Sequence, residues 1–163
     1  MLGVLTLVLV LALVALIAYF VVRTVLARSA ESRAYKRGLA FSDSGEHGAA
    51  LRAFFEADAL WAFNASLSTP TSFVNDLKRL SNTLVQIGRE AQRLGKRLDI
   101  SSARLLIDQQ IAVYNGKANL NLESGNLKSE LEPEVKRLNQ QLRQSRAMLR
   151  SQCGRLIATP GQR

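Results

Sequence analysis

Histidine and cysteine, whose side chains serve as metal ligands and nucleophiles, each occur once in the chain, as His47 and Cys153. Around His47, the only other ligand-type residues at helical spacing are Asp43 and Glu46. We therefore interpret His47 as a surface or interhelix histidine rather than as a metal ligand or a catalytic base.

Cys153 lies in a basic helical stretch, with Arg150 and Arg155 nearby. Positive neighbours lower the pKa of a thiol, which would give this cysteine weak reactivity. A structural cysteine is the favoured interpretation.

The remaining polar residues form no pattern typical of catalysis. The carboxylates are few and scattered, and the cluster at Glu130, Glu132 and Glu134 is explained by the dipole of a helix N-terminus. The glycine pair around Glu46 and His47 lacks the Lys-Ser/Thr that follows a phosphate-binding loop. We therefore predict no catalytic residue, no cofactor and no metal, and a protein that is not an enzyme.

The mean hydropathy of +0.01 averages two unlike parts. Residues 1–22 carry no charge and are apolar except at Gly3 and Thr6, while all 22 Lys and Arg and all 13 Asp and Glu follow them. A helix of 22 residues is about 33 Å long, enough for a hydrocarbon core of about 30 Å. The sequence predicts a single transmembrane anchor at 1–22. A cleaved signal peptide is disfavoured, because no basic residue precedes the run and the run is longer than a signal core.

The charges that flank this segment predict its orientation. Five basic residues follow it closely: Arg23, Arg28, Arg33, Lys36 and Arg37. Only one acid, Glu31, lies among them, and an excess of positive charge marks the cytoplasmic side. We expect the N-terminus outside, residues 23–33 as a basic juxtamembrane segment, and a cytoplasmic C-terminal domain.

The rest of the chain predicts an all-α fold. Residues 70–116 read as bundle helices, and one apolar seam repeats at alternating spacings of four and three: Phe73, Leu77, Leu80, Leu84, Ile87, Ala91, Leu94 and Leu98. Such a seam serves either a helix of an intrachain bundle or a parallel coiled coil between copies of the chain. Asn115-Gly116 is expected to end the next helix. Residues 117–163 then give a polar connector and a basic helix that starts near Ser129.

Small and aromatic residues recur at fixed offsets between residues 34 and 60: Tyr35, Gly38, Phe41, Gly45, Ala50, Phe54, Ala57 and Leu60. This pattern resembles a tetratricopeptide repeat, a helix-turn-helix unit of 34 residues. The resemblance implies a helical hairpin at 34–69 that binds a protein partner. Only one copy is present, so another element must cover the hairpin, and the seam of residues 73–98 is the candidate.

Basic residues dominate the C-terminal helix, since no acid follows Glu134. Three interpretations of these basic residues stay open. They form a helix face exposed to solvent, they contact anionic lipid headgroups, or they bind nucleic acid or an acidic protein. The lack of aromatic residues in the tail removes base stacking and makes nucleic acid unlikely. The residues expected to touch lipid or an acidic surface are Arg23, Arg28, Arg137, Arg143, Arg146 and Arg150.

These features together predict a membrane-anchored protein-interaction module, either a scaffold or assembly factor or an accessory subunit of a membrane complex. The expected partner surface consists of Tyr35, Phe41, Phe54, Trp61 and Phe63. Two alternatives stay open: a coiled-coil protein that forms homo-oligomers in the membrane, and a basic protein that binds the membrane surface or nucleic acid.

Overall fold

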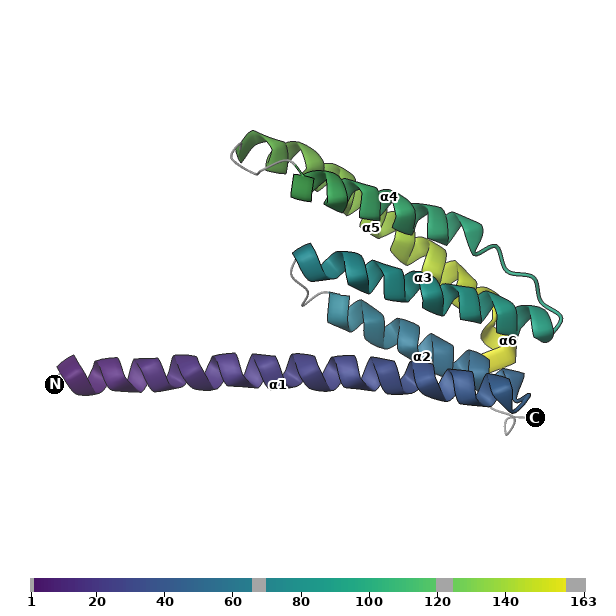
Figure 1. The fold of residues 1–163 in the computed structure, drawn as a ribbon, viewed down its shortest axis with the longest axis horizontal. Helices are drawn as coiled ribbons and strands as arrows, with labels where there is room; N and C mark the ends of the chain where they lie inside the picture. The colour runs from purple at the N-terminus through teal and green to yellow at the C-terminus, as the bar shows by residue number, and fades with distance from the viewer. Residues whose placement is uncertain (1, 66–69, 120–124, 158–163) are drawn as a thin grey trace.

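The computed structural model describes residues 2–65, 70–119 and 125–157, and within these ranges it contains helices and no strand. The all-α prediction is confirmed. The helices are α1 (Leu2–Asp43), α2 (His47–Ala65), α3 (Pro70–Arg93), α4 (Ser101–Asn119), α5 (Gly125–Gln152) and α6 (Gly154–Ile157). Figure 1 shows α2 to α6 gathered beside the C-terminal half of α1, while the N-terminal half of α1 projects alone.

α1 is one unbroken helix of 42 residues, about 63 Å long. Its large apolar side chains from Leu9 to Leu26 are 49–63% exposed, and by length and composition the helix can cross a membrane. From Glu31 onward the same helix buries one face, with Ala34 and Gly38 against the bundle. One helix therefore joins the apolar segment to the bundle without a break.

α1 and α2 form an antiparallel hairpin joined at Gly45. Gly45 has φ of +80°, a conformation that suits glycine, and Glu46 N–H donates to the carbonyl of Phe41 at 2.8 Å. Further back, a Cβ on Gly38 would lie 2.6 Å from the Phe54 ring. The two helices therefore touch where the small residue of one meets the aromatic ring of the other.

The apolar seam of α3 packs inside the chain. Leu77, Leu80, Leu84, Ile87 and Ala91 are fully buried and share one core with residues of α2 such as Leu51, Phe54 and Phe55. α3 thus covers the hairpin. The apolar seam of α3 packs against residues of the same chain.

The prediction that this helix continues to Leu98 was wrong. α3 ends at Arg93, because Gly95 adopts φ of +79° and Lys96 N–H donates to the carbonyl of Ala91 at 2.8 Å. Leu94 and Leu98 still pack on the core from the loop that follows.

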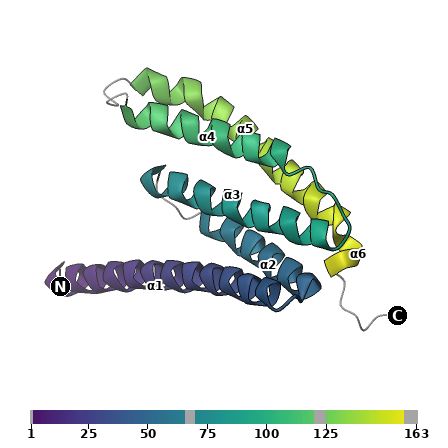
Figure 2. The same cartoon turned by 45° about the vertical axis from the view of Figure 1, so that its right-hand side comes forward.

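α4 and α5 form a second antiparallel pair, seen most clearly in Figure 2. The helix end predicted at Asn115-Gly116 was wrong, since Gly116 has no positive φ and α4 continues to Asn119. α5 begins at Gly125 rather than near Ser129, and Pro133 lies inside it rather than in its first turn. At its other end, Leu142, Leu149 and Cys153 join the main core.

Candidate functional site: the ion-paired joint between α1 and the bundle

Four charged residues connect α1 to α3 just beyond the exposed apolar half of α1. We call Arg28, Glu31, Asp76 and Arg79 the joint. Arg79 Nε donates to Glu31 Oε1 at 3.1 Å, and its Nη2 lies 2.8 Å from Asp76 Oδ1. Arg28 Nη2 approaches Asp76 Oδ2 at 3.8 Å. Because Glu31 and Asp76 are buried, their arginine partners offset the cost of burying these negative charges.

Trp61 extends this connection to α2 and α5. Its indole N–H donates to the backbone carbonyl of Asp76 at 2.6 Å, and the guanidinium of Arg146 lies 4.8 Å from its ring centroid. Arg146 also donates from Nε to Asp58 Oδ1 and from Nη2 to the Asp58 carbonyl oxygen, both at 2.7 Å. One arginine of α5 is thereby held against two residues of α2.

A third polar cluster lies beside the turn between α1 and α2. Glu90 of α3 is fully buried, and His47 Nδ1 lies 2.8 Å from its Oε2. Ser42 Oγ and Arg93 Nη1 donate to its Oε1 at 2.8 and 2.9 Å. His47 is therefore an interhelix histidine. Among the described residues, no three His, Cys, Asp or Glu side chains gather as metal ligands would.

The aromatic residues expected to face a partner lie mostly inside the chain. Phe54 and Trp61 are buried in the core, and the Tyr35 ring meets the Phe54 ring edge-on with centroids 5.5 Å apart. Phe41 is partly buried against the same core, whereas the side chain of Phe63 lies outside the described part of the structure. Phe54 and Trp61 are therefore wrong as residues of an exposed partner surface, because they share one buried core with residues of α3.

The arginines expected to touch lipid or an acidic surface divide into three groups. Arg23, Arg137 and Arg143 are exposed, while Arg28 belongs to the joint. Arg146 is almost buried against Asp58, so a lipid contact for it is wrong. Arg150 is exposed but lies 5.8 Å from the Phe55 ring, at the end of α5 away from the apolar half of α1 (Figure 1).

The buried carboxylates are the residues that sequence reasoning missed. Asp76 and Glu90 each have an arginine three residues later, a helical spacing that signals an ion pair on one face. Glu31 and Asp58 pair instead with arginines 48 and 88 residues away in the sequence, for which no local pattern exists.

Cys153 is buried, and burial raises the pKa of its thiol, an effect that the nearby Lys96 partly offsets. This burial agrees with the favoured interpretation of a structural cysteine, because desolvation of the thiolate outweighs the attraction of the cation.

A cavity of about 340 Å³ opens beside the joint, between α1 and α3. Arg28, Glu31 and Tyr35 line it from α1, and Arg79, Asn82 and Thr83 line it from α3. The cavity lies next to the point where the exposed apolar surface of α1 ends.

The fold and the joint together define an all-helical chain whose long apolar helix is ion-paired into its own bundle. Comparison with protein-family models, with curated proteins and with solved structures finds no match for this chain.

Proposed function

We propose that the protein is a single-pass membrane protein in which α1 anchors a helical interaction module. It would serve as a scaffold, an assembly factor or an accessory subunit of a membrane complex. The observation that carries this proposal is the contrast between the two halves of α1. The large apolar side chains of the first half are exposed from Leu9 to Val22, and the second half is ion-paired to α3 through Glu31.

The continuity of α1 bears on how such a module would work. No loop separates the apolar half from the half that packs in the bundle, since both belong to Leu2–Asp43. A membrane anchor of this kind would hold the bundle at a fixed distance and orientation above the bilayer. This suits a subunit that positions a partner rather than one that captures it on a flexible tether.

The proposed orientation has the N-terminus outside and the bundle in the cytoplasm. Arg23 and Arg28 follow the apolar run, and their long side chains can reach the headgroups of the cytoplasmic leaflet. Arg23 Nη1 lies 3.4 Å from the hydroxyl of Tyr19, an aromatic residue of the kind that favours this interface.

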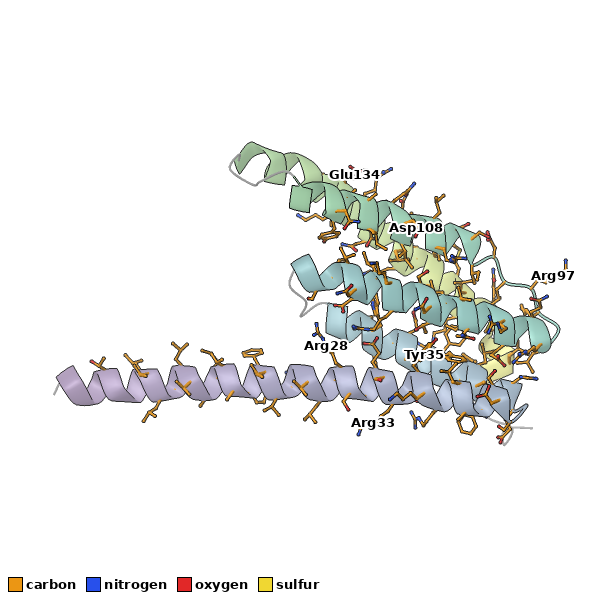
Figure 3. All side chains as sticks on the ribbon, in the orientation of Figure 1. Arg28, Arg33, Tyr35, Arg97, Asp108 and Glu134 are labelled. Atoms are coloured by element: carbon orange, nitrogen blue, oxygen red, sulfur yellow. The ribbon has the colours of Figure 1, made fainter. Side chains whose placement is uncertain are left out.

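The proposed partner surface lies on the outer side of α1. Figure 3 shows Arg33 on the side of α1 away from the bundle, and the exposed Lys36 follows it at helical spacing. An acidic protein partner fits these charges. The hairpin behind them, which we propose as a single tetratricopeptide-like unit, is supported by the contact of Gly38 with the Phe54 ring.

Self-assembly through the α3 seam is the weaker alternative. Leu77, Leu80 and Leu84 would have to leave the core of their own chain to pair with a second copy. The apolar half of α1 is the surface left for association between copies, within the bilayer.

The anchor is tested by alkaline extraction of membranes from cells that express the full chain. Leu13→Arg with Leu16→Arg places two charges in the apolar run, each costing about 3 kcal/mol at the centre of a bilayer. We expect this variant to move into the soluble fraction. Gln140→Arg with Gln144→Arg adds the same charges to exposed positions of α5 and should stay in the pellet with the unmodified protein. Equal extraction of both variants would contradict the anchor.

The partner surface is tested by co-purification in mild detergent. Arg33→Glu with Lys36→Glu should lose protein partners that the unmodified chain retains. Lys78→Glu with Arg104→Glu changes the charge by the same amount at other exposed positions and should keep them. An unchanged set of partners for the first variant would contradict this surface.

A further inference from the structure

The cavity between α1 and α3 has the size of a ligand site. Its volume of about 340 Å³ falls at the lower end of the range of about 300–1,000 Å³ for small-molecule pockets. Its lining joins two guanidinium groups, Arg28 and Arg79, to the carboxylate of Glu31 and to the uncharged polar side chains of Ser32, Tyr35, Asn82 and Thr83. The two guanidinium groups carry only hydrogen-bond donors and can bind a small group that carries negative charge.

The carboxylates of the joint hold these arginines in place. Glu31 and Asp76 are buried and pair with Arg79, whose side chain remains 44% exposed. Arg79 makes these pairs with Nε and Nη2. The side chains of Arg28 and Arg79 stay 40% and 44% exposed while the carboxylates behind them are buried, so an anion in the cavity can reach the guanidinium groups. A guanidinium that is already held by ion pairs with carboxylates binds a phosphate oxygen with little further loss of side-chain entropy.

The level of the cavity along α1 indicates where such an anion comes from. The uncharged segment 1–22 is about 33 Å long, enough for a hydrocarbon core of about 30 Å. Arg28 follows six residues later, about 9 Å further along the helix, and Figure 3 shows it on the side of α1 that faces the bundle. In a membrane spanned by this run, the cavity would open at the level of the lipid phosphates.

We propose that this cavity binds the phosphate diester of an anionic phospholipid from the membrane that α1 spans. Arg28 and Arg79 supply the cationic N–H donors, and the side chains of Tyr35, Asn82 and Thr83 surround the rest of the headgroup. The site presupposes the membrane anchor proposed above, and it assigns to the bundle a lipid ligand that would fix its position against the bilayer surface.

The test uses the full chain in nanodiscs of phosphatidylcholine that contain a minority of phosphatidylglycerol. Native mass spectrometry after release counts the lipids that stay bound. The unmodified chain should retain phosphatidylglycerol in preference to phosphatidylcholine. Asn82→Glu adds a carboxylate to the cavity wall and should lower this retention about tenfold, the effect of losing one charge-assisted contact. Gln92→Glu makes the same charge change at an exposed position of α3 outside the cavity and should leave retention unchanged.

Two further arms separate the possible failures. Arg79→Gln should also lose phosphatidylglycerol, and Trp61 emission reports whether each variant is folded, since Trp61 is the one tryptophan of the chain. Soluble glycerol phosphate should not displace phosphatidylglycerol from the protein. If it does, and the protein shows no preference for phosphatidylglycerol over phosphatidylcholine, the ligand is a soluble phosphate and the lipid assignment is overturned. Equal retention by Asn82→Glu and Gln92→Glu overturns the site while the anchor stands. A chain that does not enter nanodiscs at all overturns both.

Discussion

The indole N–H of Trp61 donates a 2.6 Å hydrogen bond to the backbone carbonyl of Asp76, whose side chain is paired with Arg79. One residue of α3 therefore binds α2 through its main chain and the joint through its side chain. Because Glu31 of α1 shares the same arginine, the base of the projecting helix is tied to both α2 and α3. The polar contacts around Asp76 thus meet at the place where α1 leaves the bundle.

Removing Arg146 should destabilise the bundle strongly. Arg146→Ala leaves the buried Asp58 without its partner and takes the cation from the Trp61 ring, so we expect a loss of about 3–5 kcal/mol in the free energy of unfolding. Arg143→Ala, one turn earlier on α5, removes an exposed arginine and should change stability by about 0.5 kcal/mol or less. Denaturant titration followed by circular dichroism measures both. Similar losses for the two variants would contradict the packing of α5 against α2.

Two glycines should respond in opposite directions to the same substitution. Gly38→Ala forces a methyl group against the Phe54 ring and should cost about 1–3 kcal/mol. Gly116→Ala, in the last turn of α4, meets nothing within 4 Å and should stabilise the protein by up to about 1 kcal/mol. Thermal unfolding of the two variants compares them, and a neutral Gly38→Ala would mean that α1 and α2 do not approach as closely as described.

Asp99 should make the start of α4 sensitive to acid. Hydrogen bonds from the side chains of Ser101 and Ser102, together with one from the Ser101 N–H, hold the pKa of Asp99 below its ordinary value of 3.8. The Ser101 N–H donates to the carboxylate at 3.0 Å and the Ser102 Oγ at 2.9 Å. A pKa lowered by folding gives stability that is fully present above pH 3.8 and is lost as the pH falls through the folded-state value. The stability difference between the unmodified protein and Asp99→Ala should therefore be constant near neutral pH and shrink below pH 3.8. A difference that does not change with acid would refute this role.

Cys153 should react slowly with alkylating reagents. Burial raises the pKa of its thiol, and the thiolate is the species that attacks iodoacetamide. A cysteine placed at the exposed position 140, as Gln140→Cys in a Cys153→Ser background, should react faster at pH 8, and the difference should vanish in denaturant. Equal rates in the folded protein would show that the end of α5 does not pack on the core as described.

The regular elements of this fold could be predicted because they rest on local patterns. The uncharged run before Arg23 and the seam from Phe73 to Ala91 each repeat over several helical turns. Helix ends were harder, since Gly95 takes a left-handed conformation and Gly116 does not, and the packing around each glycine decides between the two.

The joint could not be predicted, since it depends on contacts between distant parts of the chain. Glu31 and Arg79 lie 48 residues apart, and nothing near either residue indicates the other. The exposure of the aromatic side chains could not be predicted from their spacing alone. In an isolated α1–α2 hairpin, Phe54 and Trp61 would be exposed to solvent. In the full chain both are buried beside α3.

The central claim is that α1 spans a membrane and holds the bundle on the cytoplasmic side. It is tested most directly by labelling Gln140→Cys, in the Cys153→Ser background, with a membrane-impermeant maleimide and then recovering the alkali-resistant membrane pellet. We expect the protein in the pellet, unlabelled in intact cells and labelled once the cells are permeabilised. Labelling in intact cells would contradict the orientation, and recovery of the protein in the alkaline supernatant would contradict the anchor itself.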